Sequence, residues 1–451
     1  MPVPTWRLAV AAAMGSIVVL LAPVDPWIAL AVVNALLLVL AVVDWRRAVP
    51  PDRLDVEREV PGVVGLDAPA EVRWRVHNPT GRALRLRLAD QLGPSLRPDS
   101  RRAALRVPAN GRAGARTRIR PSRRGRFAPA QVTLRIEGPW GLAARQGPQH
   151  VPGIIRVYPP FHSRDEAELR INRARILEVG LRSAQGRGGG TEFDALREYS
   201  EDDEFRRIDW AATARAHKPI VRTYRAERNQ TILTLLDSGR IMAGLVEPFQ
   251  RSVLADTAAG RAPAVPRLDH AMDAVMMLTA VSTRLGDRAG FIAFADEVRR
   301  VVPPGHTRGQ LARVTEAMYD LEPRLVESDY RSAFTESITR FRRRALLVLL
   351  TELGPAAAEE TLLPALPLVV RDHLVIVAGV RDPAVERWAM AAPTDAAAAY
   401  RKTAAVQSLG QRRRLVARLR ALGATVIDAV PGRMAPELAD AYLKVKATGR
   451  L

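Results

Sequence analysis

Two long apolar segments at the amino terminus constrain this chain more than any other feature. Residues 8–24 read LAVAAAMGSIVVLLAPV and residues 27–43 read WIALAVVNALLLVLAVV, and neither contains a charged side chain. Each has about 17 residues, the short end of what crosses a bilayer core as a helix. A break containing Pro23, Asp25 and Pro26 separates them, because proline cannot continue a helix. The sequence therefore predicts a transmembrane helical hairpin over residues 1–47, with spans at about 8–24 and 27–43.

The charges that flank these segments predict their orientation. Arg7 precedes the first segment, Arg46 and Arg47 follow the second, and the loop between them carries only Asp25. Because cytoplasmic ends are enriched in basic residues, we expect a multi-pass anchor in the cytoplasmic (inner) membrane, with the soluble domains in the cytoplasm. Two alternatives stay open at this point: a cleaved signal peptide and a buried helical hairpin of a soluble domain.

Residues 52–158 show the two-residue period of β-strands. Val72, Trp74 and Val76 alternate with charged residues, and similar runs recur between turns rich in proline and glycine. Several short alternating strands without a helical stretch predict a β-sandwich over 52–158.

This β-rich region also holds most of the excess positive charge. Residues 46–150 contain 22 arginines, no lysine and nine acidic residues, which accounts for +13 of the chain's formal net charge of +20. The arginines suit either a solvent-exposed face of each sheet or a surface lying against anionic headgroups of a nearby bilayer. No nucleic-acid partner is expected, because only Trp74, Phe127 and Trp140 are available for base stacking.

A segment over 160–230 is dense in alternating acids and arginines. Such a pattern suits an interlocked set of ion pairs, because arginine binds a carboxylate through two hydrogen bonds. Acid–base catalysis by these acids, as in a hydrolase, is the alternative, but the only histidine near them in sequence is His217. The residues that we expect to form an interaction motif are Arg197, Glu198, Tyr199, Asp203, Arg207, Asp209, Trp210 and Arg215.

This motif resembles the signature of the bacterial family called domain of unknown function 58. The matching positions are Arg197-Glu198-Tyr199, Asp203, Arg207-Ile208-Asp209-Trp210 and Ala214-Arg215, while Asp202 stands where the family usually has glycine. Members of the family are commonly encoded beside a MoxR-type AAA+ ATPase. The resemblance therefore implies an adaptor that partners such an ATPase in protein maturation or envelope-related stress.

From residue 231 to 451 short apolar runs alternate with helical patterns. Strands are predicted at 232–236, 289–294, 345–350, 374–378 and 425–427, and helices near 268–285, 308–320, 330–343, 404–422 and 435–447. Short buried strands that alternate with amphipathic helices predict a parallel, doubly wound α/β sheet. Two arginine triplets, 342–344 and 412–414, are interpreted as solvated helix surfaces or ends.

The end of the first of these strands resembles the metal site of the von Willebrand factor A domain. That site opens Asp-x-Ser-x-Ser; here Asp237 matches, Ser238 follows it, and Gly239 and Ile241 replace both serines. Glu352 stands where the family has a later aspartate. The resemblance implies a degenerate site formed by Asp237, Ser238, Gly239 and Glu352, at which Mg²⁺ is not expected because two hydroxyl ligands are missing.

These observations predict a membrane-anchored multidomain protein that acts through binding. The order is a transmembrane helical hairpin, a β-sandwich, the signature segment and a von Willebrand factor A-like α/β domain. No catalytic residue, cofactor or confident metal ligand is assigned, and the absence of cysteine excludes a thiol nucleophile. The expected partners are a MoxR-type AAA+ ATPase and the lipid bilayer. The alternative function is a Mg²⁺-dependent adhesion or ligand-binding module.

Overall fold

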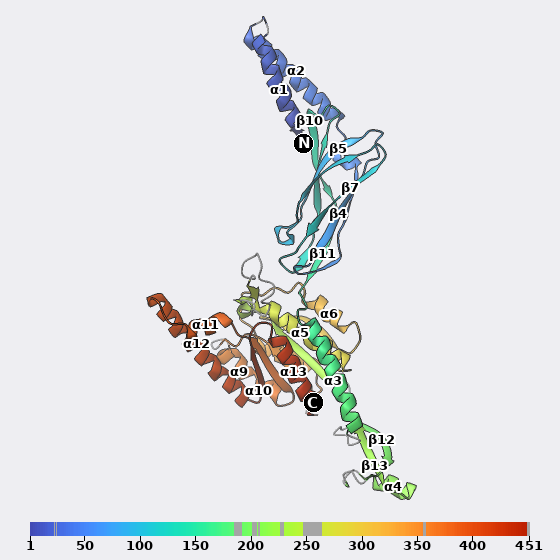
Figure 1. Ribbon diagram of the computed structural model, residues 1–451, viewed down its shortest axis with the longest axis vertical. Helices are drawn as coiled ribbons and strands as arrows, with labels where there is room; N and C mark the ends of the chain where they lie inside the picture. The colour runs from blue at the N-terminus through green and yellow to red at the C-terminus, as the bar shows by residue number, and fades with distance from the viewer. Residues whose placement is uncertain are drawn as a thin grey trace. The chain divides into compact units, whose positions relative to one another are not determined.

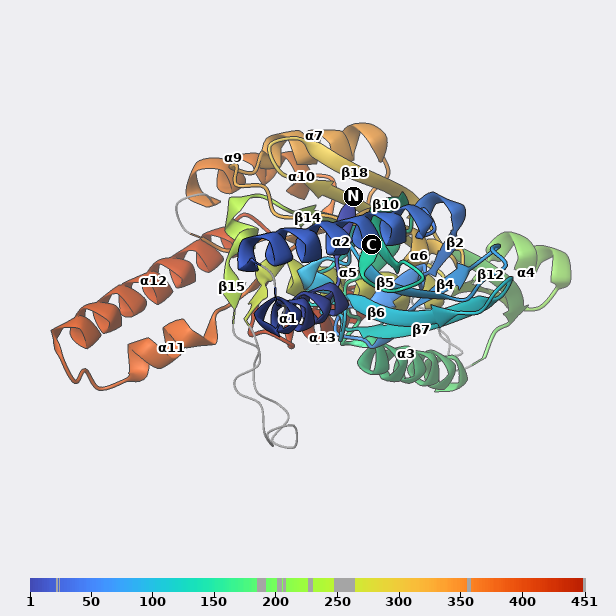
Figure 2. The same ribbon diagram turned by 90° about the horizontal axis from the view of Figure 1, so that it is seen from above.

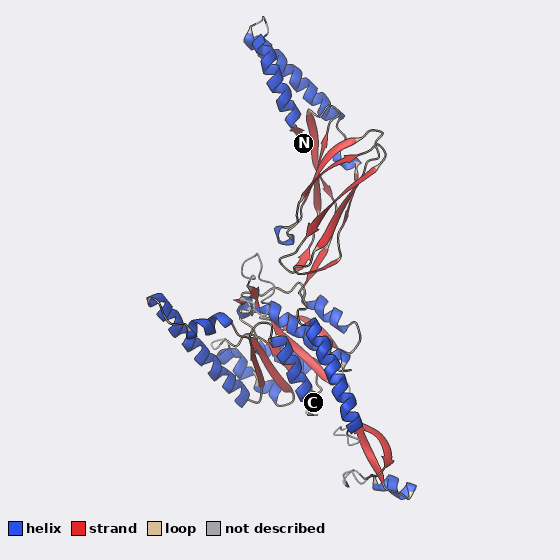
Figure 3. Cartoon of the chain, in the orientation of Figure 1, coloured by secondary structure: helices blue, strands red, loops and turns tan. Residues whose placement is uncertain are grey.

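A computed structural model describes residues 1–21, 23, 25–184, 192–200, 205, 208–225, 230–246, 264–354 and 358–448. The chain divides into two compact units, Met1–Tyr158 and Pro159–Leu451. Both helices and strands are present in each unit, so the prediction of a mixed α and β protein with several sheets is confirmed (Figure 3).

Two helices begin the first unit. The first, α1 (Trp6–Leu21), has 16 residues, and α2 (Pro26–Arg47) has 22. Asp25 caps α2 by accepting a hydrogen bond from the Trp27 amide at 2.9 Å. The two helices lie side by side (Figures 1 and 2), and a Cβ on Gly15 would lie 2.7 Å from Val33 Cγ1. Close packing therefore requires glycine at position 15.

The apolar surfaces of these helices remain exposed within the unit. The segment Pro26–Arg53 is long and apolar enough to cross a membrane, and none of its apolar window is buried. The helix α1 is apolar as well but shorter. One helix thus passes the length and composition test among the described residues, where the sequence predicted two spans.

Three sheets complete the first unit and enclose one apolar core. Their orders are β1-β10-β9-β5-β6, β2-β4-β7 and β3-β11-β8. The strands are β1 (Pro2–Pro4), β2 (Asp55–Glu59), β3 (Val63–Gly65), β4 (Ala70–His77), β5 (Leu84–Asp90), β6 (Arg102–Val107), β7 (Arg112–Ile119), β8 (Gly125–Phe127), β9 (Gln131–Glu137), β10 (Ala143–His150) and β11 (Ile155–Tyr158). In β4 the side chains of Val72, Trp74 and Val76 are buried and the arginines between them are exposed, as the period of two requires.

Asp44, in the last turn of α2, joins the helices to the sheets. Its buried carboxylate accepts hydrogen bonds from the backbone amides of Trp140 (2.8 Å), Leu142 (2.7 Å) and Ala143 (2.9 Å). A Cβ on Gly138 would overlap this carboxylate, so the turn approaches α2 through a residue without a side chain. Because β1 also pairs with β10, both helices are attached to the same edge of the five-stranded sheet.

The second unit is built on a six-stranded sheet of order β18-β17-β14-β19-β20-β21. Numbered along the chain, these strands read 3-2-1-4-5-6, the order of a doubly wound sheet. The strands are β14 (Thr231–Asp237), β17 (Arg288–Phe294), β18 (Val298–Gly305), β19 (Leu346–Leu350), β20 (Leu374–Val380) and β21 (Thr425–Ala429). All neighbours run parallel except β18, which pairs antiparallel with β17 at the edge.

Helices cover both faces of this sheet, and two apolar clusters fill the space beneath them. The helices α5 and α13 contribute to one cluster and α7 and α12 to the other. Burial on both faces explains why the strands read as continuous apolar runs. The helices of the unit are α3 (Arg164–Ala184), α4 (Trp210–Ala216), α5 (Arg267–Arg284), α6 (Gln310–Met318), α7 (Tyr330–Arg340), α9 (Leu363–Ala365), α10 (Pro367–Val370), α11 (Pro383–Met390), α12 (Ala396–Ala421) and α13 (Met434–Ala447).

The structure contains elements of this unit that were not predicted or that begin elsewhere, among them β18, α11 and α12. The strand β18 was not predicted, because Pro303 and Pro304 argue against a strand in the sheet interior; the edge position removes that objection. The helix α11 was not predicted either. The helix α12 begins at Ala396, eight residues before the predicted start at 404, because Asp395 caps it through the Ala398 amide.

Two small β-pairs complete the unit. The strands β12 (Glu192–Glu198) and β13 (Ile220–Arg225) pair antiparallel, and α4 lies between them in the chain. The strands β15 (Leu245–Val246) and β16 (Val265–Pro266) form the second pair.

Removal of the Asp44 carboxylate should loosen the turn that it holds. In Asp44→Ala, one buried and two part-buried amides lose a charged acceptor, which costs about 3 kcal/mol or more in local opening. Hydrogen–deuterium exchange over residues 138–145 of the detergent-solubilised chain should then accelerate roughly 100-fold. Asp25→Ala, at the other end of α2, should leave exchange there unchanged, and equal exchange in the wild type and Asp44→Ala would contradict the role of Asp44.

Candidate functional site

The candidate site lies at the carboxyl end of β14, between β17 and β19. Because β14 and β19 are the first and fourth strands of the sheet in chain order, the sheet reverses its winding between them. Ligands of doubly wound sheets bind at such a switch point. The last residue of β14 is Asp237, and Thr351 and Glu352 directly follow β19.

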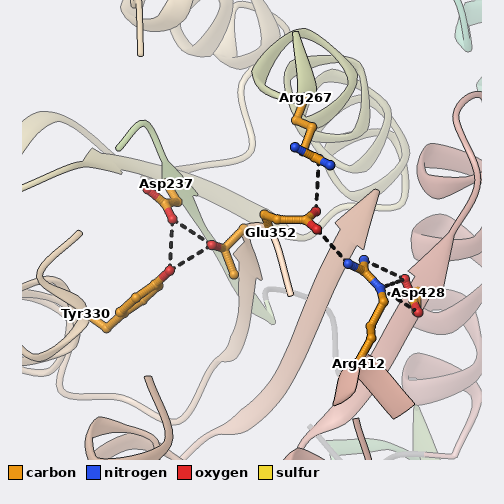
Figure 4. A network of polar contacts seen from close by, with 7 residues as sticks. Asp237, Arg267, Tyr330, Glu352, Arg412 and Asp428 are labelled. Atoms are coloured by element: carbon orange, nitrogen blue, oxygen red, sulfur yellow. Dashed lines mark hydrogen bonds and ion pairs between the residues drawn. The ribbon is translucent and has the colours of Figure 1, made fainter. Parts of the chain in front are cut away.

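Asp237 is fully buried and accepts four hydrogen bonds. Its Oδ1 accepts from Ser328 Oγ at 2.6 Å and from the Gly239 amide at 2.8 Å. Its Oδ2 accepts from Thr351 Oγ1 at 2.6 Å and from the Tyr330 hydroxyl at 3.0 Å. The side-chain hydroxyls come from the loop before α7, from the start of α7 and from the residue after β19. Figure 4 shows the hydrogen bond between Tyr330 and Asp237.

Burial dominates the electrostatics of this carboxylate. It raises the pKa of Asp237, and the four hydrogen bonds oppose that shift because they stabilise the ionised form. The same burial, together with the charge of Asp237, raises the pKa of the Tyr330 hydroxyl well above its ordinary value. Tyr330 therefore remains protonated and acts as a donor to the carboxylate.

Gly239 and Ser238 have structural roles beside Asp237. A Cβ on residue 239 would overlap the Ser328 hydroxyl, so Ser328 occupies the space where a side chain at 239 would begin. Ser238 donates from its hydroxyl to the Phe294 carbonyl at 2.7 Å and accepts from Arg299 Nη1 at 3.0 Å. Neither residue directs an oxygen into an open cavity.

Glu352 belongs to a second network next to the first (Figure 4). Its Oε1 accepts a hydrogen bond from Arg412 Nη1 at 2.6 Å, and its Oε2 lies 3.2 Å from Arg267 Nε in an ion pair without hydrogen-bond alignment. Arg412 also binds Asp428, with Nε 3.0 Å from both carboxylate oxygens and Nη2 2.8 Å from Oδ1. Burial acts to lower the pKa of Arg412, but the two carboxylates prevail and raise it.

Arg412 corrects one prediction. The triplet 412–414 was interpreted as a solvated helix surface, whereas Arg412 is only 9% exposed and lies between two carboxylates. Other members of the site, among them Ser328, Tyr330 and Asp428, were missed because no local motif marks them. Two of the missed residues had a positional signal: Thr351 directly follows a predicted strand, and Asp428 lies in the last strand of the sheet.

The residues of these networks do not fit a divalent cation. Mg²⁺ requires about six oxygen ligands in an octahedron. Both oxygens of Asp237 are already bound by donors, and Glu352 faces two guanidinium groups. Within the described ranges no group of three His, Cys, Asp or Glu residues could hold a metal ion. The carboxylates at the carboxyl ends of the strands are therefore occupied by hydrogen-bond donors and arginines of the protein itself.

The described residues of the signature motif lie at the end of β12 and in α4 with its cap. Asp209 caps α4 through the amides of Ala211 and Ala212, at 3.0 Å each, and its other oxygen binds Arg222 Nε at 2.7 Å. The hydrogen bond from Arg222 is the largest cause of a lowered pKa of Asp209. Glu198 forms an ion pair with Lys218. The acids thus pair with Arg222 and Lys218, which the sequence analysis did not single out.

The other motif residues have varied placements. Arg197 donates to the Glu198 carbonyl at 3.1 Å, the Tyr199 amide donates to the Pro219 carbonyl at 2.9 Å, and Arg215 donates to the Ala211 carbonyl at 3.2 Å. Asp203 and Arg207 lie outside the described residues.

Two aromatic residues near the motif are exposed together. Trp210 begins α4 with 61% of its surface exposed, and Phe205 is 67% exposed. Their rings pack edge to face with centroids 5.6 Å apart.

The buried network of Arg412 should contribute much more stability than a surface ion pair. Arg412→Met leaves two carboxylates without their counter-charge and should lower the free energy of unfolding by about 3–5 kcal/mol. The matched control is Arg418→Met on the same helix, which removes an exposed pair with Glu359 and should cost less than about 1 kcal/mol. Equal shifts of the denaturation midpoint in the two variants would contradict this assignment.

A serine at position 239 should destabilise the site. In Gly239→Ser the new Cβ overlaps the Ser328 hydroxyl, so we expect a loss of about 1–3 kcal/mol from overpacking. The double variant Gly239→Ser with Ser328→Gly should recover part of this loss, measured by thermal unfolding. Unchanged stability of the single variant would show that Ser328 does not occupy the serine's space.

Comparison with known proteins finds a family-model match for part of the chain. No curated protein sequence matches it significantly. Among solved structures, conserved hypothetical protein BatB from Bacteroides thetaiotaomicron is 13% identical, with a TM-score of 0.32, over 49% of this chain and 99% of that one. The CARDB domain of the PF1109 protein from Pyrococcus furiosus, in complex with di-metal ions, is 12% identical, with a TM-score of 0.17, over 25% of this chain and 90% of that one. The family model described as "Protein of unknown function DUF58" matches residues 195–391, which confirms over that range the resemblance predicted from the signature motif.

Proposed function

We propose that this protein is a membrane-anchored, non-enzymatic adaptor that binds a MoxR-type AAA+ ATPase through its signature segment. The observation that carries the proposal is the exposed aromatic pair Phe205 and Trp210. Large aromatic side chains that are exposed together are costly in water and are typical of protein–protein interaction sites. The ATPase as partner comes from the family resemblance of the motif that contains them.

The charged groups around Trp210 support a docking role over catalysis. Asp209 is engaged by two amides and by Arg222, and Glu198 is paired with Lys218. A general base requires a carboxylate that can reach a substrate proton and a pKa near the working pH. The lowered pKa of Asp209 argues against that role, so these pairs serve best to fix the backbone that presents the aromatic residues.

We further propose that the α/β part of the second unit is a von Willebrand factor A-like domain. Supporting this are the 3-2-1-4-5-6 strand order, the antiparallel edge strand β18 and the position of Asp237 at the end of the first strand. The alternative of a Mg²⁺-dependent adhesion module has less support, because Asp237 and Glu352 are both bound by protein groups.

The proposed anchor is the pair of helices α1 and α2 as a transmembrane hairpin, with both ends and the two units on the cytoplasmic side. Its support is the apolar, unburied surface of α2, the neighbouring apolar helix α1, and the basic residues Arg7, Arg46 and Arg47 at their shared end. Carbonate extraction of cell membranes tests this anchor: the chain should stay in the pellet.

Trp210→Ala should weaken binding of the ATPase. A buried tryptophan at the centre of an interface contributes about 2 kcal/mol or more, so recovery of the ATPase from solubilised membranes should fall roughly 30-fold. The matched control is Trp388→Ala in α11, where the side chain is 46% exposed and lies outside the motif. A wild-type pull-down without any AAA+ ATPase, or equal recovery with both variants, would refute the proposal.

A further inference from the structure

A basic cavity lies in the first unit where the two apolar helices meet the sheets. It has a volume of about 170 Å³, and Arg7, Arg47, Arg82, Arg85 and Glu137 contribute to its lining. Arg7 is in the first turn of α1, Arg47 is the last residue of α2, Arg82 and Arg85 lie at the start of β5, and Glu137 ends β9. Four cationic side chains and one carboxylate therefore give this cavity a net charge of +3.

The arginines of the cavity are not neutralised by carboxylates. Within the described part of the chain, none of the four forms an ion pair with an acidic residue. Arg82 donates to the Arg47 carbonyl, and the Arg47 guanidinium lies 5.4 Å from the centre of the Trp140 ring. Some arginines of the sheets are paired, as Arg73 is with Glu71 and Arg75 with Glu59. Others stay unpaired among the described residues but lie apart on the strands, so what distinguishes the cavity is that four arginines line one small space.

The backbone around the cavity is fixed in place. Gly141 has a φ of +71°, and a Cβ there would lie 2.7 Å from Arg7 Nη1, so Arg7 packs against a turn that requires glycine. The same turn is held by the three hydrogen bonds to Asp44. The arginines are thus presented by a preformed frame, which lowers the entropy cost of binding a ligand.

The place of the cavity indicates the source of its ligand. Arg7 and Arg47 mark the shared end of two apolar helices, and this end lies at the headgroup level if the helices cross the membrane as proposed above. Tryptophans lie at the same end of the helices: Trp140, 44% exposed, packs against the Arg47 guanidinium, and Trp45 is in the last turn of α2. Indole rings favour this boundary because they are apolar with one polar group.

We propose that this cavity binds the phosphodiester group of an anionic phospholipid of the cytoplasmic leaflet. The inference rests on the proposed membrane anchoring. Guanidinium groups bind phosphate oxygens in a planar, two-bonded geometry, and basic pockets at the ends of membrane helices suit anionic headgroups. Glu137 adds an acceptor for a headgroup hydroxyl, which phosphatidylglycerol carries and phosphatidylcholine lacks.

Native mass spectrometry of the full chain in an uncharged detergent tests the proposal. With phosphatidylglycerol added, the wild type should retain one lipid roughly tenfold more than with phosphatidylcholine, since the net positive charge of the cavity favours an anionic headgroup over a zwitterionic one. Arg82→Gln with Arg85→Gln should abolish this preference. The matched control, Arg118→Gln with Arg120→Gln, removes the same charge outside the cavity lining and should preserve it.

Three results separate the possible failures. Equal retention of the two lipids by a wild type that stays in carbonate-washed membranes would overturn the phospholipid site and leave the anchor intact. Release of the wild type by carbonate would overturn the anchor and with it this inference. Displacement of the lipid by inorganic phosphate at equal concentration would assign the cavity to a free anion and overturn the lipid as its ligand.

Discussion

The structure of the second unit depends on buried carboxylates at the carboxyl ends of its strands and on the groups that bind them. A carboxylate without contact with water is costly unless hydrogen bonds replace its hydration, and Asp237 obtains four of them. Its donors belong to the turn after β14, to the region at the start of α7 and to the residue after β19, so satisfying one charge fixes the relative positions of three segments. Beside it, Arg412 joins α12 to β19 and β21 through Glu352 and Asp428. Hydrogen bonds and ion pairs therefore connect the segments at the carboxyl ends of the strands to one another.

The sequence predicted those parts of the fold that repeat a local pattern. The residues of β4 alternate between apolar and charged because one face of the strand is buried. Those of β14 and β19 are continuously apolar because both faces are buried. The edge strand β18 was missed because it contains two prolines. Proline is compatible with a strand only at the edge of a sheet, and the sequence alone does not show which strand is at the edge.

The candidate site was predictable in its location but not in its chemistry. Asp237 and Glu352 were predicted from a motif resemblance at the carboxyl ends of two strands, which is where sites of parallel sheets form. What they bind was not predictable, since Ser328 and Arg412 come from distant segments that only the tertiary structure brings together. Arg412 in particular looks like any exposed arginine in a helix, and its role depends on the acids that face it.

The three amide hydrogen bonds of Asp44 have a mechanical consequence. A helix whose last turn is bonded to a sheet turn, and whose partner helix is preceded by a strand of the same sheet, cannot change its tilt independently of that sheet. In a bilayer, tilt responds to the thickness of the hydrocarbon layer. If α1 and α2 cross a bilayer as proposed, a local change in membrane thickness would therefore reorient the sheets of the first unit.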